Sequence, residues 1–299
     1  MVGGIPAGGD RAPGAGGRDG IKNRTQLLIF TVYGRYSPVL DHWAGIGHLV
    51  EMMRHLGVEA PATRSAVARL VRGGFLVGET RGGVRGYAAT QQAQAIFAEG
   101  DAIIYSSMEP SSLADGWTIV SYSVPESRRE DRYQLRRRLE WLGMGNLGGG
   151  LWIGPARVAS GLMAWMRKLG FEGYVDVFSA RYEGFASLEE LVRRCWDLTS
   201  LGTAYDTYVA EWGPQLRRLR RRTTGPDPAE AFRLYTTALE ERLRFPYLDP
   251  RLPAEMLPPS WSGERAHALF NDLRDRLEEP AFAFVRALVR PAGDADRAQ

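Results

Sequence analysis

The chain has 299 residues, a length that corresponds to two or three domains at about 100–200 residues each. Hydrophobic residues make up 44% and charged residues 24%, which excludes wholesale disorder. No run approaches the ~18–20 apolar residues of a membrane span, so no membrane association is expected. A single cysteine, Cys195, and four histidines leave few groups for a disulfide framework, a metal site or a catalytic triad.

The formal net charge of +3 is concentrated near the N-terminus. Residues 1–21 are rich in glycine and lack the apolar core of a secretory signal, so we expect a disordered tail there. From Lys22 to Thr90, nine basic residues stand against four acidic ones, a balance of 9 − 4 = +5. The rest of the chain offsets this excess, and the basic stretch is therefore the first place to look for an acidic partner.

Three helices are predicted in this basic stretch. An apolar-rich helix begins near Leu27, a second helix covers about 43–56 and ends at Gly57, and a third covers about 60–72. Gly73 and the glycine after it end the third helix. Its predicted apolar stripe is Ala66, Val67, Leu70 and Val71, and its predicted opposite face carries Arg64, Ser65, Ala68, Arg69 and Arg72.

A β-hairpin is predicted directly after the third helix. Strands at 75–79 and 87–90 flank a turn at 81–86 that carries three glycines and the arginines Arg81 and Arg85. Three helices followed by a basic hairpin is the order of a winged helix-turn-helix domain, here 22–90, which typically binds double-stranded DNA. The residues expected to contact DNA are Thr63, Arg64, Ser65, Arg69, Arg72, Arg81 and Arg85. Protein interaction and an ordinary solvated face are the alternatives.

The middle of the chain is predicted to be an α+β domain at 116–184, after a connecting helix and linker at 91–115. Strands, helices and a glycine-rich loop alternate in a βαβαβ pattern, which indicates a ferredoxin-like sandwich. The predicted elements are strand 117–124, helix 126–142, loop 143–150, strand 151–153, helix 156–169 and strand 173–182.

Two functional alternatives in this domain have little support. The loop 143–150 lacks the Gly-Lys-Ser/Thr ending of a phosphate-binding loop and precedes a strand, so a flexible connection is preferred. Nuclease chemistry needs paired metal-binding carboxylates, whereas Glu126 stands alone after the first strand. The arginines between Arg128 and Arg138 share their helix with Glu126, Glu130, Asp131 and Glu140, which favours a salt-bridged solvated face over a site for DNA or an acidic ligand.

The C-terminal region, 185–290, is predicted to be a helical domain for effector binding or dimerisation, with a polar tail at 291–299. The predicted helices are 187–201, with a capping box formed by Ser187 and Glu190, then 205–222, 228–244 and 263–288. Its arginine run at 217–222 is either a phosphate clamp or a solvated helix end. The candidate effector residues are Arg217, Arg218, Arg221, Tyr247 and Trp261.

Three blocks of sequence resemble one family in the same order. The helix text 63–76, the stretch from Trp117 to Ile153 and the stretch 245–263, which contains Phe-Pro-Tyr-Leu-Asp-Pro, look like PaaX-family transcriptional repressors. Together the blocks cover about residues 24–290. The chain departs from the family pattern at Glu59, where a small hydroxyl residue often caps the third helix and where Glu is a poorer N-cap.

This resemblance implies a ligand-responsive DNA-binding regulator with a Cas2-like middle domain and, in the best-known branch, an aryl-acyl-CoA thioester as effector. We therefore expect a cytoplasmic homodimeric repressor that binds (pseudo)palindromic operators, without cofactor or metal and without catalytic activity. The alternatives are an enzyme or binding protein for an acyl-CoA or nucleotide, and a protein-interaction scaffold.

Overall fold

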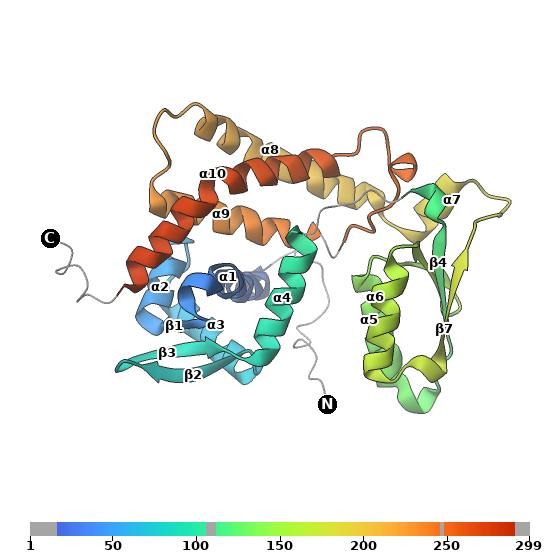
Figure 1. Cartoon of the computed structure of the whole chain (residues 1–299), viewed down its shortest axis with the longest axis horizontal. Coiled ribbons are helices and arrows are strands. Elements are labelled where there is room, and N and C mark those ends of the chain that lie inside the picture. The colour runs from blue at the N-terminus through green and yellow to red at the C-terminus, as the bar shows by residue number, and fades with distance from the viewer. Residues whose placement is uncertain (1–16, 106–111, 246–247, 291–299) are drawn as a thin grey trace. The chain divides into compact units, whose positions relative to one another are not determined.

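A computed structural model of the chain describes residues 17–105, 112–245 and 248–290 (Figure 1). The predicted N-terminal tail lies outside the described residues up to residue 16. The prediction is wrong for residues 17–21, which are helical, because the first helix begins at Gly17 and not near Leu27. The predicted C-terminal tail, 291–299, and the candidate residue Tyr247 lie outside the described residues as well.

The chain folds into two compact units. Unit 1 comprises 1–106, 212–242 and 268–299, and unit 2 comprises 107–211 and 243–267. Two long helices, α8 (Leu198–Arg220) and α10 (Gly263–Val289), contribute residues to both units. The predicted domain boundaries at 22–90, 116–184 and 185–290 stay a prediction.

Unit 1 contains several helices and a small antiparallel sheet with strand order β1-β3-β2, whose β2–β3 hairpin lies at the edge of the unit (Figure 1). Its elements in chain order are α1 (Gly17–Leu40), β1 (Trp43–Gly45), α2 (Ile46–His55), α3 (Ala60–Arg72), β2 (Leu76–Arg81), β3 (Val84–Ala89), α4 (Gln91–Tyr105) and α9 (Pro228–Arg242), with parts of α8 and α10.

The structure corrects two details of the predicted basic stretch. The second helix begins at Ile46, three residues later than predicted, because Trp43–Gly45 forms the short strand β1 against β3. The predicted turn at 81–86 is shorter: strands β2 and β3 continue to Arg81 and from Val84, and only Gly82 and Gly83 connect them. Both glycines have positive φ, which suits a two-residue hairpin whose twist matches its strands.

Helix α1 joins the start of the chain to helices from its end, within unit 1. The Tyr36 hydroxyl hydrogen-bonds the Thr236 hydroxyl of α9 at 2.8 Å, and both residues are buried. The Arg35 guanidinium donates to the Tyr235 hydroxyl at 2.8 Å and to the Glu278 carboxylate of α10. Buried polar groups of this kind need such partners, and these bonds fix how α1, α9 and α10 pack together.

Unit 2 contains an antiparallel sheet with strand order β5-β6-β4-β7. Its elements are β4 (Trp117–Tyr122), α5 (Arg129–Trp141), β5 (Gly145–Gly148), β6 (Leu151–Pro155), α6 (Val158–Leu169), β7 (Val175–Ala180) and α7 (Leu188–Cys195), with short 3₁₀ turns at Leu113–Asp115, Glu126–Arg128, Glu172–Tyr174 and Ala254–Met256. Part of the predicted loop 143–150 is therefore a strand, because β5 and β6 form a hairpin through Gly148–Gly150.

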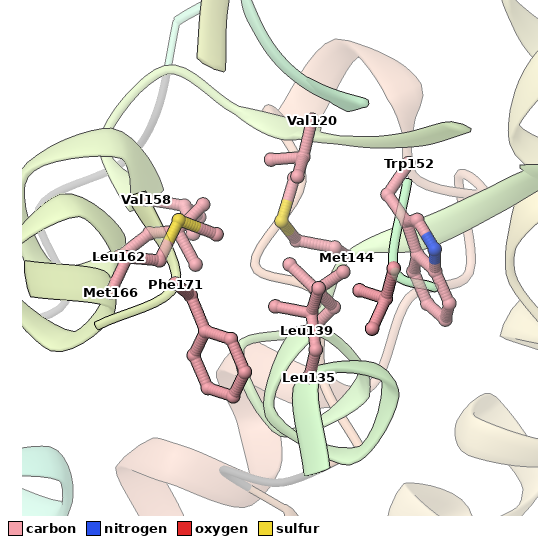
Figure 2. Packing of buried hydrophobic residues seen from close by; sticks show 10 residues of the cluster. Val120, Leu135, Leu139, Met144, Trp152, Val158, Leu162, Met166 and Phe171 are labelled. Atoms are coloured by element: carbon pink, nitrogen blue, oxygen red, sulfur yellow. The ribbon is translucent and has the colours of Figure 1, made fainter. Parts of the chain in front are cut away.

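Helices α5 and α6 bury one face of this sheet. Figure 2 shows Leu135 and Leu139 of α5 and Leu162 and Met166 of α6 directed into one cluster with Trp152 of β6. Leu135, Leu139 and Leu162 are fully buried. At about 1.5–3 kcal/mol for each large apolar side chain, this cluster supplies much of the stability of unit 2.

A second cluster lies around Trp117 and Ile153, and α7 contributes Leu191 and Val192 to it. The predicted capping box at the start of α7 is confirmed: Ser187 Oγ accepts from the Glu190 amide, and the Glu190 carboxylate accepts from the Ser187 amide. The predicted helix 187–201 is nevertheless two helices, since α7 ends at Cys195 and α8 begins at Leu198.

Within the described residues, no helix combines the length and the apolar character needed to cross a membrane.

Candidate nucleic-acid interface

The connection between α2 and α3 is set by Gly57. Its φ of +76° is a conformation that side-chain-bearing residues rarely adopt. The Gly57 amide donates to the Arg54 carbonyl at 3.0 Å, and the Val58 amide donates to the Met53 carbonyl at 2.9 Å. This pair of bonds is a Schellman motif, which satisfies the last carbonyls of α2 and turns the chain into α3. The predicted end of the second helix at Gly57 is confirmed.

The first turn of α3 is stabilised without a side-chain cap. Glu59 occupies the N-cap position and its side chain accepts no capping bond, in agreement with its expected weakness there. Pro61 lies in the first turn, where its missing amide hydrogen costs nothing. The Thr63 hydroxyl donates to the Glu59 carbonyl at 3.2 Å and is buried.

Helix α3 has one buried face and one exposed face. The buried residues are Thr63, Ala66, Val67 and Leu70. Val71, predicted for the buried stripe, is 37% exposed, and Thr63, predicted to contact DNA, is 0% exposed. Successive residues of a helix are about 100° apart, which places residue 63 between 66 and 67 and puts 71 at the edge of the stripe. Thr63 therefore anchors the helix and presents no atom to a ligand.

The exposed face of α3 carries three arginines with different surroundings. Arg64 and Arg72 are exposed and form no ion pair with any described residue. Arg69 is half-buried and donates to the Ser65 hydroxyl one turn earlier at 3.2 Å. Ala68, in the middle of this face, is exposed and leaves room for a close approach. The face thus offers free guanidinium groups with five donors each.

The hairpin of β2 and β3 holds its two arginines differently. Arg81 donates to the Glu79 carboxylate at 2.8 Å and to the Asp41 carboxylate at 2.9 Å, and its guanidinium lies 5.5 Å from the Trp43 ring. The hydrogen bond to Glu79 raises the pKa of Arg81. Arg85 is exposed and has no ion pair within the described part of the chain. Asp41 lies forty residues before Arg81, so sequence spacing gave no signal of this pair.

Close packing beneath the hairpin requires Gly86. A Cβ at this position would lie 2.5 Å from the Ala44 carbonyl oxygen and 2.5 Å from the Trp43 ring. Gly86 is paired with Gly45 of β1. The Trp43 side chain therefore rests directly on the backbone of β3, and this contact fixes β3 against β1.

The candidate effector residues do not form one group within either unit. Arg218 shares the Glu230 carboxylate with Arg222, at 2.7 and 2.5 Å, whereas Arg217 and Arg221 are exposed without an ion pair to a described residue. These arginines belong to unit 1 and Trp261 belongs to unit 2.

Trp261 takes part in an aromatic cluster of unit 2. Its ring meets the Tyr205 ring edge-on at 5.5 Å between centroids, and Tyr205 stacks on Phe245 at 4.2 Å. The Tyr205 hydroxyl donates to the buried Asp249 carboxylate at 2.7 Å. These contacts account for the aromatic residues as packing groups of this region.

On α5 and in the turn before it, Arg128, Arg132 and Arg136 form ion pairs with acids, in agreement with the salt-bridged interpretation for these three residues. Arg132 contacts Glu126 at 2.7 Å, Arg136 contacts Glu140 at 3.7 Å, and Arg128 pairs with Asp131. Arg128 also donates to the Tyr174 hydroxyl at 2.9 Å. In the described ranges, no group of three or more His, Cys, Asp or Glu side chains is placed to hold a metal ion.

Comparison with known proteins finds matches along most of the chain. Residues 24–93 match the family described as PaaX-like protein, residues 110–192 match the PaaX protein central Cas2-like domain, and residues 196–287 match the PaaX-like protein C-terminal domain.

Two individual proteins give the scale of this similarity. The Transcriptional repressor PaaX of Escherichia coli (strain K12) is 25% identical over 264 residues, which are 86% of this chain and 82% of the relative. The solved structure of the Uncharacterized protein Rv0674 from Mycobacterium tuberculosis aligns with a TM-score of 0.50 at 19% identity, over 82% of this chain and 92% of that one, and it shares the fold.

Proposed function

The chain belongs to the PaaX family, and from this premise we propose that it is a transcriptional regulator that binds double-stranded DNA through α3 and the β2–β3 hairpin. The similarity to a transcriptional repressor supports a regulator rather than an enzyme. The observation that carries the assignment to this surface is the exposed face of α3, where Arg64 and Arg72 have no ion pair with a described residue.

The order of elements from α1 to β3 supports a winged helix-turn-helix domain. Helices α2 and α3 are joined by the Gly57 turn, and the antiparallel sheet β1-β3-β2 follows the arrangement in which the hairpin forms the wing. In unit 2, the order β4-α5-β5-β6-α6-β7 supports a ferredoxin-like domain.

Each exposed arginine has a proposed role that follows from its position. Arg64, in the first turns of α3, would read a guanine edge in the major groove, with Ser65 and Arg69 beside it. Arg72, at the end of α3, and Arg85, in the wing, would contact phosphates. Arg81 would contribute mainly through the structure of the wing, because Asp41 and Glu79 already neutralise its charge.

We also propose a homodimer that binds a (pseudo)palindromic operator, because two-fold protein symmetry matches two half-sites. A regulator of chromosomal genes would act in the cytoplasm. A small-molecule effector would release it from DNA by favouring an arrangement with lower DNA affinity. For its family relatives an aryl-acyl-CoA is the expected class of effector.

Fluorescence anisotropy tests this proposal. A labelled duplex from the promoter of the neighbouring operon is titrated with the full chain at several salt concentrations, next to a scrambled duplex of the same composition. We expect tighter binding to the promoter, and log affinity that falls linearly with log salt as phosphate-bound counterions are released. Equal affinity for both duplexes would refute the proposal.

A further inference from the structure

We propose that a pocket in unit 1 binds a small organic monoanion with an apolar body, and that this ligand acts on the wing. The pocket has a volume of about 530 Å³ and is lined by Pro38, Val39, Phe282, Arg286, Val289 and Arg290. This volume lies within the range of about 300–1,000 Å³ that small-molecule sites occupy. The effect on the wing rests on the proposed DNA-binding function, whereas ligand binding itself does not.

The apolar part of the pocket is formed where the end of α1 meets the last turns of α10. Pro38 and Val39 come from α1, and Phe282 and Val289 come from α10. The Phe282 ring is fixed from behind by the Tyr36 ring at 5.0 Å and by the Arg35 guanidinium at 4.6 Å. These contacts hold the Phe282 ring, and the apolar surface that it forms with Pro38, Val39 and Val289 favours a ligand with an aromatic or aliphatic body.

The charged part of the pocket favours a single negative charge. Arg286 pairs with the Glu279 carboxylate, which is 81% exposed, and Arg290 has no ion pair with a described residue. Two guanidinium groups and one carboxylate leave a local charge of 2 − 1 = +1. A guanidinium binds a carboxylate or sulfonate through parallel hydrogen bonds, so Arg290 is the expected anchor of the anionic group.

The end of α1 at this pocket is also the start of the turn that holds the wing. Pro38 and Val39 are followed, after Leu40, by Asp41 and His42, which both have positive φ, at 47° and 55°. Residues other than glycine adopt this conformation at an energetic cost, and such turns are common where a structure switches.

Two hydrogen bonds connect this turn to both strands of the wing. The Asp41 carboxylate accepts from Arg81 at 2.9 Å, and the His42 carbonyl accepts from the Ala89 amide at 2.8 Å. A ligand that displaces the end of α1 would therefore shift Arg81 and the end of β3. The pocket is thus placed to change the position of the wing without touching it.

Two fluorescent probes test the pocket in the full chain. The anion 8-anilinonaphthalene-1-sulfonate and its neutral analogue N-phenyl-1-naphthylamine share the same rings and differ in the sulfonate. We expect Arg290→Gln to weaken the sulfonate at least about fivefold and to leave the neutral analogue unchanged, because the variant removes one charge-assisted contact. Val39→Trp should block both probes by filling the pocket. Arg276→Gln, an exposed arginine of α10 outside the pocket, is the matched control and should leave both affinities unchanged.

A second measurement tests the effect on DNA. Anisotropy of a red-labelled promoter duplex is recorded with and without saturating sulfonate probe, for wild type and Val39→Trp. We expect the probe to lower the DNA affinity of wild type alone, and DNA to lower probe affinity by the same factor, since the coupling is reciprocal.

The proposed site would be overturned if the sulfonate probe did not bind at all. It would also be overturned if the probe bound equally well to wild type, Arg290→Gln and Val39→Trp. Probe binding without any change in DNA affinity would overturn the link to the wing. DNA binding without the probe tests the proposed function separately.

Discussion

Two helices of unit 1 carry several arginines, and they differ in what those arginines contact. On α3, Arg64 and Arg72 have no ion pair with a described residue. At the end of α8, Arg218 and Arg222 share Glu230, and Arg220 pairs with Asp272. The longer arginine run is therefore the more neutralised one. A count of arginines does not identify a nucleic-acid surface; the acids supplied by neighbouring elements decide which charges stay free.

The difference follows from the packing partners of each helix. The buried face of α3 is set by apolar residues and Thr63, so no acid is placed beside its arginines. The end of α8 lies next to the start of α9, where Glu230 accepts from two arginines. The charge of an arginine that is already paired is partly neutralised, and the arginine must give up its partner before it binds a phosphate, so it contributes less to DNA binding than a free arginine does.

The largest expected effect comes from breaking the wing that supports the α3 surface. In Gly86→Ala, the new Cβ meets the Ala44 carbonyl and the Trp43 ring at 2.5 Å. Overpacking of this kind costs about 1–3 kcal/mol, and here the backbone itself must shift. Urea unfolding measures the loss. The matched control is Gly78→Ala on β2, where a Cβ meets nothing within 4 Å; an equal loss in both variants would contradict the packing of Trp43 on β3.

The next effect concerns the α3 surface itself. Arg64→Ala should lose about 1–3 kcal/mol of preference at one base pair of the operator, because a bidentate contact to guanine is removed. Arg221→Ala is the control at the end of α8, since Arg221 is also exposed and unpaired among described residues. Competition with single-base variants of the promoter duplex measures the preference. If Arg221→Ala lost base preference and Arg64→Ala did not, the DNA-binding surface would lie at the end of α8 and not on α3.

A smaller and different effect is expected at the tip of the wing. Arg85→Ala should weaken binding to all duplexes alike and reduce the slope of log affinity against log salt by about 1, because one phosphate contact is lost. Anisotropy at four or more salt concentrations measures the slope. A change confined to base preference would mean that Arg85 contacts a base instead of a phosphate.

The smallest effect on stability and on DNA affinity should come from Glu230→Gln, since Glu230 pairs with arginines at the end of α8. The hydrogen bond from Arg222 lowers the pKa of the Glu230 carboxyl. The pair therefore stabilises the fold at neutral pH, and this contribution is lost as pH falls through the lowered pKa. The urea midpoints of wild type and Glu230→Gln should differ slightly at pH 7 and converge in acid. Promoter affinity should stay within about twofold despite the freed arginines; a large gain would show that the end of α8 faces DNA.

Local signals in the sequence predicted much of the fold. The glycines at 57 and 73–74 and the capping box at Ser187 mark helix ends through backbone conformation and short-range bonds. The exposed face of α3 followed from helical periodicity, with Thr63 and Val71 exchanged at its edge. The strands β1 and β5 were missed, because runs of three or four residues that include glycine carry no alternating pattern.

Contacts between distant segments were beyond the sequence. No spacing rule connects Arg81 with Asp41, or Arg35 with Glu278. These pairs decide which predicted site residues keep a free charge and how α1 packs with α9 and α10. The sequence therefore identified the helix that carries the candidate interface, and only the structure separated its free arginines from the paired ones.

Site-specific crosslinking tests the central claim most directly. A photoreactive benzoylphenylalanine replaces Ala68, in the middle of the exposed face of α3, and in a second variant replaces Arg217 on α8; both positions are exposed. Irradiation in the presence of labelled promoter duplex should crosslink DNA from position 68 and not from position 217. Crosslinks from position 217 alone would contradict the assignment of α3 as the DNA-binding surface.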